Sequence, residues 1–84
     1  MYTYVFNPQA LKILQKLPKD IQKRIIKKLD YFISSTNPLT FAESLINYDI
    51  GQYRFRIGDY RVIFDLEDQT IIILTLGNRR DIYK

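Results

Sequence analysis

YRFRIGDYRVIF, residues 53–64, is the segment from which the fold of this chain of 84 residues can be worked out. Apolar and polar side chains alternate on both sides of Gly58-Asp59, and such a two-residue connection is typical of a tight β-hairpin. The turn fixes the register and places Arg56 opposite Arg61. The predicted apolar face, which must look toward the core, consists of Tyr53, Phe55, Ile57, Tyr60, Val62, Phe64 and Leu66.

The opposite face of this hairpin concentrates positive charge. Arginines that face each other across two strands repel, and the planar fork of a guanidinium group suits a phosphate placed between them. We therefore expect an anion-binding face. The alternative is that these are ordinary solvent-facing arginines paired with Asp59, Asp65 or Asp81. The residues on this face are Gln52, Arg54, Arg56, Arg61, Ile63 and Asp65.

The sequence before the hairpin predicts a strand and two helices. Residues 2–6 are aromatic and β-branched, which favours a strand. Asn7-Pro8 is a typical helix start, and leucines at helical spacing predict a first helix over about 8–16. After the break at Pro18, an apolar stripe predicts a second helix over about 18–34.

The sequence after the helices completes an α+β pattern. Residues 39–50 have room for one short helical turn, and the apolar run over 70–76 predicts a buried last strand. We expect a single domain, residues 1–84, in which an antiparallel sheet of about four strands packs against an N-terminal helical hairpin. The predicted order is β-α-α-β-β-β.

The composition limits the chemistry that the chain can perform. It has no cysteine and no histidine, which excludes disulfides, serine–histidine triads and the usual zinc sites. We expect no metal and no other cofactor, so any catalysis must use arginine, lysine, tyrosine or carboxylates. The first residues do not resemble a signal peptide, and no apolar run is long enough to span a bilayer. We therefore expect a soluble, cytoplasmic protein without a membrane partner.

The positive charges are divided by residue type. The net charge of +4 favours polyanionic partners. Six of the seven lysines lie in the first 28 residues, whereas five of the six arginines lie between positions 54 and 80. Lys23 and Lys27, on the second predicted helix, are candidate RNA contacts, and the alternative is an ordinary solvated helix surface.

A second polar cluster follows the last predicted strand, in GNRRDIY, residues 77–83. This segment would return Arg79, Arg80 and Tyr83 toward one edge of the sheet. Tyr83 is a candidate for proton transfer or for stacking on a base. The alternative is that it is a packing residue that anchors the end of the chain.

YRFRIGDYRVIF and GNRRDIY together resemble the RelE/ParE toxins of type II toxin–antitoxin systems, and the likeness covers nearly the whole chain. The resemblance implies a ribosome-dependent endoribonuclease that cuts mRNA in the decoding site, inhibits translation and is neutralised by a cognate antitoxin. In that family the 2′-hydroxyl attacks the adjacent phosphate, leaving a 2′,3′-cyclic phosphate and a 5′-hydroxyl. The partners implied are the antitoxin, the ribosome with its mRNA and, for the antitoxin complex, operator DNA.

The resemblance also assigns roles to particular residues. It implies that Arg61 and Arg79 stabilise charge on the phosphorane, and that Tyr83 stacks on or orients the substrate. Well-studied RelE members have lysines where this chain has Arg54 and Arg56, and arginine practically cannot lose a proton, so the general base is left open. The catalytic positions that carry over are Arg54, Arg56, Arg61, Arg79 and Tyr83, and the RNA-binding candidates are Arg54, Arg56, Arg61, Arg79, Arg80, Lys23 and Lys27.

Two other functions fit the same sequence. One is a ParE-like inhibitor of DNA gyrase that is not itself an enzyme, for which these arginines would matter less. The other is a catalytically inactive relative that is retained as the partner of an antitoxin. An amphipathic antitoxin segment that folds on binding is expected in all three cases, so antitoxin binding does not separate them.

Overall fold

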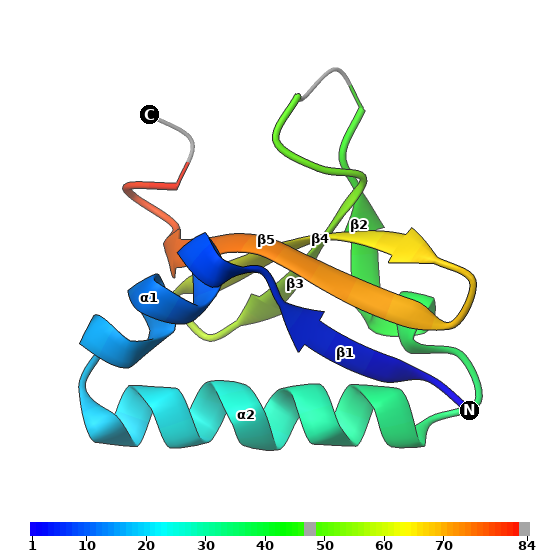
Figure 1. The fold of residues 1–84 in the computed structure, drawn as a ribbon, viewed down its shortest axis with the longest axis horizontal. Coiled ribbons are helices and arrows are strands. Elements are labelled where there is room, and N and C mark those ends of the chain that lie inside the picture. The colour runs from blue at the N-terminus through cyan, green and yellow to red at the C-terminus, as the bar shows by residue number, and fades with distance from the viewer. Residues whose placement is uncertain (47–48, 83–84) are drawn as a thin grey trace.

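The computed structural model describes residues 1–46 and 49–82 and has an α+β architecture, as predicted (Figure 1). Both α-helices lie on one side of a twisted sheet. The longest helix has 16 residues, and no helix in the described part of the chain is long and apolar enough to cross a membrane. The elements are β1 (Thr3–Phe6), α1 (Pro8–Lys16), α2 (Lys19–Ser34), the 3-10 helix η1 (Pro38–Phe41), β2 (Ala42–Ser44), β3 (Tyr53–Ile57), β4 (Tyr60–Glu67) and β5 (Thr70–Asn78).

Local capping explains where the two helices begin and end. The side chain of Asn7 accepts a hydrogen bond from the Ala10 amide at 2.7 Å, and Pro8 occupies the first helical turn. Leu17 and Pro18 have extended backbones and separate α1 from α2. The side chain of Gln22 donates to the Leu17 carbonyl at 2.8 Å and so satisfies a carbonyl at the end of α1.

Within the described residues, the sheet has five strands in the order β1-β5-β4-β3-β2, which corrects two details of the prediction. The added strand is β2, whose three residues are too few for an alternating pattern to be recognised. In addition, β1 pairs with β5 in parallel, whereas the other neighbours are antiparallel. No short turn joins β1 to a neighbour in the sheet, so nothing local forces β1 to run antiparallel.

The β3–β4 hairpin has the predicted register, with Arg56 opposite Arg61. Gly58 adopts a φ of 59° in the turn, a left-handed conformation that favours glycine. Phe55 lies at the centre of the core, since its ring centroid is 4.5 Å from that of Phe32 on α2 and 4.4 Å from that of Phe64 on β4. The apolar face of the hairpin therefore looks toward the helices, as expected.

The face of the sheet turned away from the helices is partly covered. Ile63 lies on this face beside Arg54 and is fully buried. Gly51 lies against it so closely that a Cβ on Gly51 would come within 2.6 Å of Ile63 Cγ2. The segment leading into β3 thus covers part of this face, beside Arg54.

Candidate nucleic-acid interface

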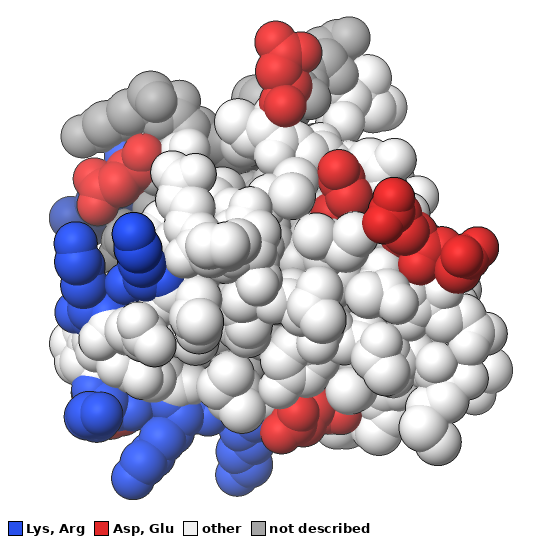
Figure 2. Space-filling view, in the orientation of Figure 1, with Lys and Arg blue, Asp and Glu red and all other residues white. Residues whose placement is uncertain are grey.

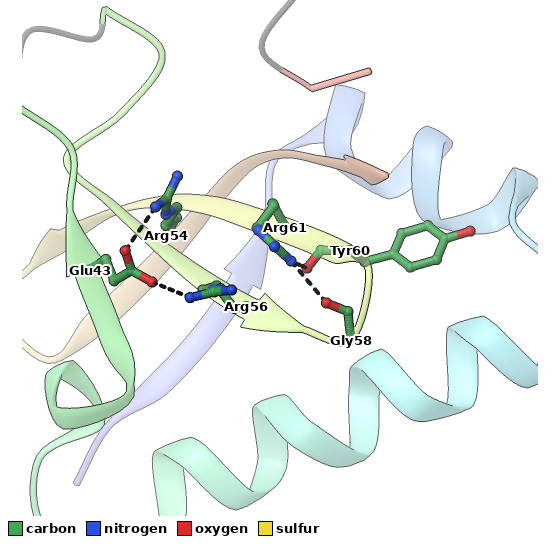
Figure 3. A network of polar contacts seen from close by, with 6 residues as sticks. All are labelled: Glu43, Arg54, Arg56, Gly58, Tyr60 and Arg61. Atoms are coloured by element: carbon green, nitrogen blue, oxygen red, sulfur yellow. Dashed lines mark hydrogen bonds and ion pairs between the residues drawn. The ribbon is translucent and has the colours of Figure 1, made fainter. Parts of the chain in front are cut away.

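The three arginines of the hairpin share the sheet face turned away from the helices (Figure 3). Arg54 and Arg56 alternate along β3, and Arg61 lies on β4 opposite Arg56. On its other side, Arg61 faces Gly77 of β5, which has no side chain. The sequence predicted this juxtaposition from the turn alone. The three guanidinium groups do not, however, all point outward into solvent, and each has its own partners.

Glu43 of β2 connects two of these arginines. Its Oε2 atom accepts a hydrogen bond from Arg54 Nη2 at 2.8 Å, and its Oε1 atom is 3.4 Å from Arg56 Nη1 (Figure 3). The hydrogen bond from Arg54 is the largest effect on the pKa of the Glu43 carboxyl and holds it below its usual value. Burial is the next largest effect and opposes it, while the charge of Arg54 and the hydrogen bond and charge of Arg56 lower this pKa further. Glu43 is not among the carboxylates that the sequence suggested as partners of these arginines, because it lies on β2 and that strand was not predicted.

Arg61 is buried, with only 6% of its surface exposed. Its Nη1 atom donates to the carbonyl oxygens of Gly58 at 2.9 Å and Tyr60 at 3.0 Å, so the side chain folds back onto the hairpin turn (Figure 3). The prediction that it projects outward beside Arg54 and Arg56 is therefore wrong. Alternation predicts the sheet face on which a side chain lies. It does not predict the path that a long, flexible side chain takes across that face.

The segment after β5 brings Arg79 to the same hairpin turn. Its backbone amide donates to the Asp59 carbonyl at 2.8 Å, and its Nε atom lies 3.8 Å from Asp59 Oδ1. Arg61 and Arg79 are therefore both attached to the Gly58-Asp59 turn. Arg80 is exposed and its amide donates to Asn78 Oδ1 at 3.0 Å. Tyr83, the remaining catalytic candidate, lies outside the described residues.

A second basic surface runs along α2. Arg24, Lys27, Lys28 and Tyr31 line an open hollow of about 520 Å³. Lys28 Nζ lies 5.9 Å from the centroid of the Tyr31 ring, within the range of a cation–π contact. Lys23, the other predicted helix candidate, lines a neighbouring hollow with Lys27.

Arg24 connects this surface to the hairpin, and sequence reasoning missed it. A Cβ on Gly58 would lie 3.8 Å from Arg24 Nη1, so the helix arginine reaches the turn to which Arg61 and Arg79 are attached. One signal was present in the sequence, because Arg24 is the one arginine among the lysines of the first 28 residues. Arginine is the residue favoured for planar recognition of phosphate.

Charged side chains are unevenly distributed over the face of the molecule that Figure 2 shows. Figure 2 shows basic side chains gathered over the end at which α1, the start of α2 and the end of β5 lie, whereas acidic side chains gather near the β4–β5 turn. The β4–β5 turn carries Glu67 and Asp68. A polarised surface of this kind orients a polyanion toward its basic end.

Comparison with known proteins gives sequence matches over almost the whole chain. The family model for the ParE toxin of the type II toxin–antitoxin system, parDE, matches residues 4–83. Toxin RelG of Mycobacterium tuberculosis is 31% identical over 85 residues, which span 99% of this chain and 97% of RelG.

Solved structures of similar fold come from bacteria and archaea. A chain of the toxin–antitoxin complex RelBE2 from Mycobacterium tuberculosis matches with a TM-score of 0.76 at 29% identity, covering 93% of this chain and 98% of that chain. A chain of the archaeal RelE–RelB complex from Pyrococcus horikoshii matches with a TM-score of 0.72 at 32% identity, covering 95% and 97%. The intact E. coli RelBE complex, at 21% identity and a TM-score of 0.72, agrees in fold.

Proposed function

Because this chain belongs to the RelE/ParE family of toxins of type II toxin–antitoxin systems, we propose that it is a ribosome-dependent endoribonuclease that cuts mRNA and thereby inhibits translation. A cognate antitoxin neutralises it, and the antitoxin complex binds operator DNA. The single observation that carries the nuclease is the gathering of Arg54, Arg56, Arg61 and Arg79 around one hairpin.

The reaction requires charge stabilisation more than a special cofactor. The 2′-oxygen of a ribose attacks the adjacent phosphorus and loses its proton, and the bond from phosphorus to the 5′-oxygen breaks. The products are a 2′,3′-cyclic phosphate and a 5′-hydroxyl, which takes up a proton. Negative charge builds up on the phosphorane, and guanidinium groups fixed near it lower the barrier.

The two pairs of arginines have different tasks in this mechanism. Arg54 and Arg56 lie toward the β2 edge of the sheet and bind a phosphate of the RNA strand. Arg61 and Arg79 are attached to the hairpin turn and supply preorganised positive charge to the phosphorane. Neither pair supplies a general base, because arginine does not deprotonate. Tyr83 orients the substrate or relays a proton.

Further RNA contacts extend from the hairpin along α2. Arg24 lies between the turn and the hollow lined by Lys27 and Lys28, and Arg80 lies after β5. Cations of this kind bind the sugar–phosphate backbone without reading sequence. Lys23 and Lys27 therefore retain the role predicted for them, as contacts that position the RNA.

Translation in a purified system tests the nuclease. Adding the protein should cut mRNA only when ribosomes are present, with breaks confined to the decoding site. Arg79→Ala is a more informative variant than Arg61→Ala, because the hydrogen bond from the Arg79 backbone amide to the turn survives the change and only the exposed 3.8 Å contact of its side chain with Asp59 is lost. It should abolish cutting while the protein stays folded. Intact mRNA with the native protein would refute the proposal.

The match to the ParE family model favours inhibition of DNA gyrase as a second candidate. This function predicts blocked supercoiling by purified gyrase, with mRNA left intact. Native protein and Arg79→Ala, assayed in parallel on gyrase and on translating ribosomes, separate the two functions. A gyrase effect that survives Arg79→Ala, together with intact mRNA, would favour the inhibitor.

A further inference from the structure

We infer that Glu43 occupies, in the free protein, the place between Arg54 and Arg56 that the proposed function assigns to a phosphodiester group of RNA. The inference rests on the proposed function, since it specifies how its substrate is admitted. Glu43 would then be a residue that RNA must displace, and it would set both the affinity and the selectivity of the arginine face.

The first support is the geometry of the carboxylate. It offers one oxygen to each arginine, Oε2 to Arg54 at 2.8 Å and Oε1 to Arg56 at 3.4 Å. A phosphodiester has two non-bridging oxygens that carry its charge, and guanidinium forks bind carboxylate and phosphate in the same way. The two oxygens of Glu43 thus stand where the two oxygens of a phosphate would be held.

The second support is accessibility. The side chains of Glu43, Arg54 and Arg56 are 44%, 25% and 60% exposed, so a ligand can reach both arginines from solvent. Ion pairs at such exposure contribute little to stability, because water screens the charges. Exchanging one anion for another on these arginines therefore costs the fold little.

The third support is the position of Glu43 on the sheet. It lies directly opposite Arg54 on β2, an edge strand of three residues. Its side chain can rotate toward solvent while the backbone pairing of β2 with β3 stays intact. Displacement of Glu43 therefore needs rotation of one side chain and no opening of the core.

An internal anion makes this place between the two arginines selective. Glu43 acts at a high effective concentration, because it is attached to the neighbouring strand. A small free anion competes poorly with it, whereas a polyanion that also contacts α2 can displace it. The arginine face would thus respond to an RNA strand and resist isolated phosphate.

A binding experiment with a matched control tests this inference. The probe is a single-stranded RNA oligonucleotide with 2′-O-methyl riboses, which cannot be cleaved, and binding is followed by fluorescence anisotropy. Glu43→Gln is compared with Glu67→Gln, an exposed residue of the β4–β5 turn, because both changes remove one negative charge. Glu43→Gln should tighten binding by about two- to fivefold beyond the control, the range expected for an exposed ion pair.

The dependence on salt gives a second readout that a merely structural carboxylate would not change. Removal of the Glu43 charge should let RNA release about one more counterion, so the slope of log K against log salt should steepen by about 0.7 relative to the control. The Glu43→Asp side chain is too short to reach both arginines, so the affinity and the salt slope of this variant should lie between those of the native protein and Glu43→Gln.

Three outcomes would overturn the inference. The first is equal affinity of Glu43→Gln and Glu67→Gln for the RNA. The second is weaker binding by Glu43→Gln, which would mean that the carboxylate holds the arginines in place for RNA. The third is no binding by any variant. The probe needs neither ribosome nor cleavage, so intact mRNA in the translation assay would leave this result standing and refute the nuclease alone.

Discussion

At the scale of single residues, Arg61 joins the hairpin turn to the candidate site. It is buried, donates to two backbone carbonyls of the turn, and keeps its charge at every ordinary pH. A variant of Arg61 that loses activity therefore reports on folding and on catalysis at once. The two effects are separated by measuring stability independently.

Replacing Arg61 by alanine should lower the free energy of unfolding by about 1–3 kcal/mol, because two carbonyls lose a charged donor. Arg61→Lys should recover only part of this loss, since it lacks the guanidinium fork. Denaturant unfolding measures both. The exposed Arg80→Ala serves as the control and should stay within about 0.5 kcal/mol of native. A native-like stability of Arg61→Ala would show that the turn does not depend on this side chain.

Tyr4 provides a second test at this scale. Its hydroxyl donates to Asp30 Oδ1 at 2.8 Å and so links β1 to α2. Burial, together with the hydrogen bond and the charge of Asp30, raises the pKa of Tyr4 from 10.0 to about 12. The folded state therefore favours the protonated phenol more than the unfolded state does.

The sign of the pH effect follows from this raised pKa. The stabilisation from Tyr4 is fully present below pH 10, the ordinary value, and is lost as the pH rises to about 12. The difference in unfolding free energy between native protein and Tyr4→Phe should thus be constant below pH 10 and shrink above it. Chemical denaturation across this range measures it. A difference that does not change with pH would contradict the assigned cause.

At the scale of elements, the segment that leads into β3 is held against β4 on the sheet face turned away from the helices. Gly51 packs on Ile63, and the next residue is attached to β4 by two hydrogen bonds, from Gln52 N to Asp65 Oδ1 at 2.9 Å and from Leu66 N to Gln52 Oε1 at 3.0 Å. The start of β3, and with it Arg54, is therefore positioned by packing as well as by strand pairing.

Gly51→Ala should destabilise the protein by about 1–3 kcal/mol through overpacking. The added Cβ would lie 2.6 Å from Cγ2 of the fully buried Ile63. Thermal or denaturant unfolding measures the loss. The double variant Gly51→Ala/Ile63→Ala removes the clashing atom, so its loss should be smaller than the sum of the two single losses. Strict additivity would mean that the contact is relieved elsewhere.

The elements differ in how far sequence could predict them. The two-residue turn at Gly58-Asp59 fixed the pairing of Arg56 with Arg61, because register and side-chain direction both follow from a period of two. The N-cap and proline at Asn7-Pro8 likewise fixed the start of α1. The parallel pairing of β1 with β5 could not be predicted, because it joins strands from opposite ends of the chain.

For the candidate site, the shared sheet face of the hairpin arginines could be predicted, whereas Glu43 and Arg24 were missed. Alternation placed Arg54, Arg56 and Arg61 on one face. The pairing of Glu43 with two of them depends on β2, which is too short to carry a pattern. The return of Arg61 to its own turn depends on side-chain torsions, which no spacing rule describes.

At the scale of the whole molecule, the separation of charge sets how a polyanion approaches. Basic side chains gather at one end and acidic ones near the β4–β5 turn (Figure 2). The hollow on α2 and the hairpin turn share the basic end, with Arg24 between them. A strand bound at the arginine face can thus continue onto α2.

Neutralising the α2 hollow should weaken RNA binding in a way that depends on salt. Lys27→Ala/Lys28→Ala should make the slope of log K against log salt shallower by about 1.4, which corresponds to two phosphate contacts on a single strand. Anisotropy with the 2′-O-methyl oligonucleotide measures it. Lys12→Ala/Lys16→Ala on α1 removes the same charge and is the control. Equal slopes for the two double variants would exclude a specific role for the hollow.

The place of β5 between β1 and β4 has a consequence for biosynthesis. Of the five strands, β5 leaves the ribosome last, yet both of its neighbours need it to complete their pairing. The pairing of β1 therefore waits until β5 has been made, and the contacts between these two strands join distant positions, which slows their formation. Arg79 follows β5 and docks on the turn later still. The toxin's basic end thus assembles only after β5 and Arg79 have been made, so a shorter nascent chain lacks these contacts.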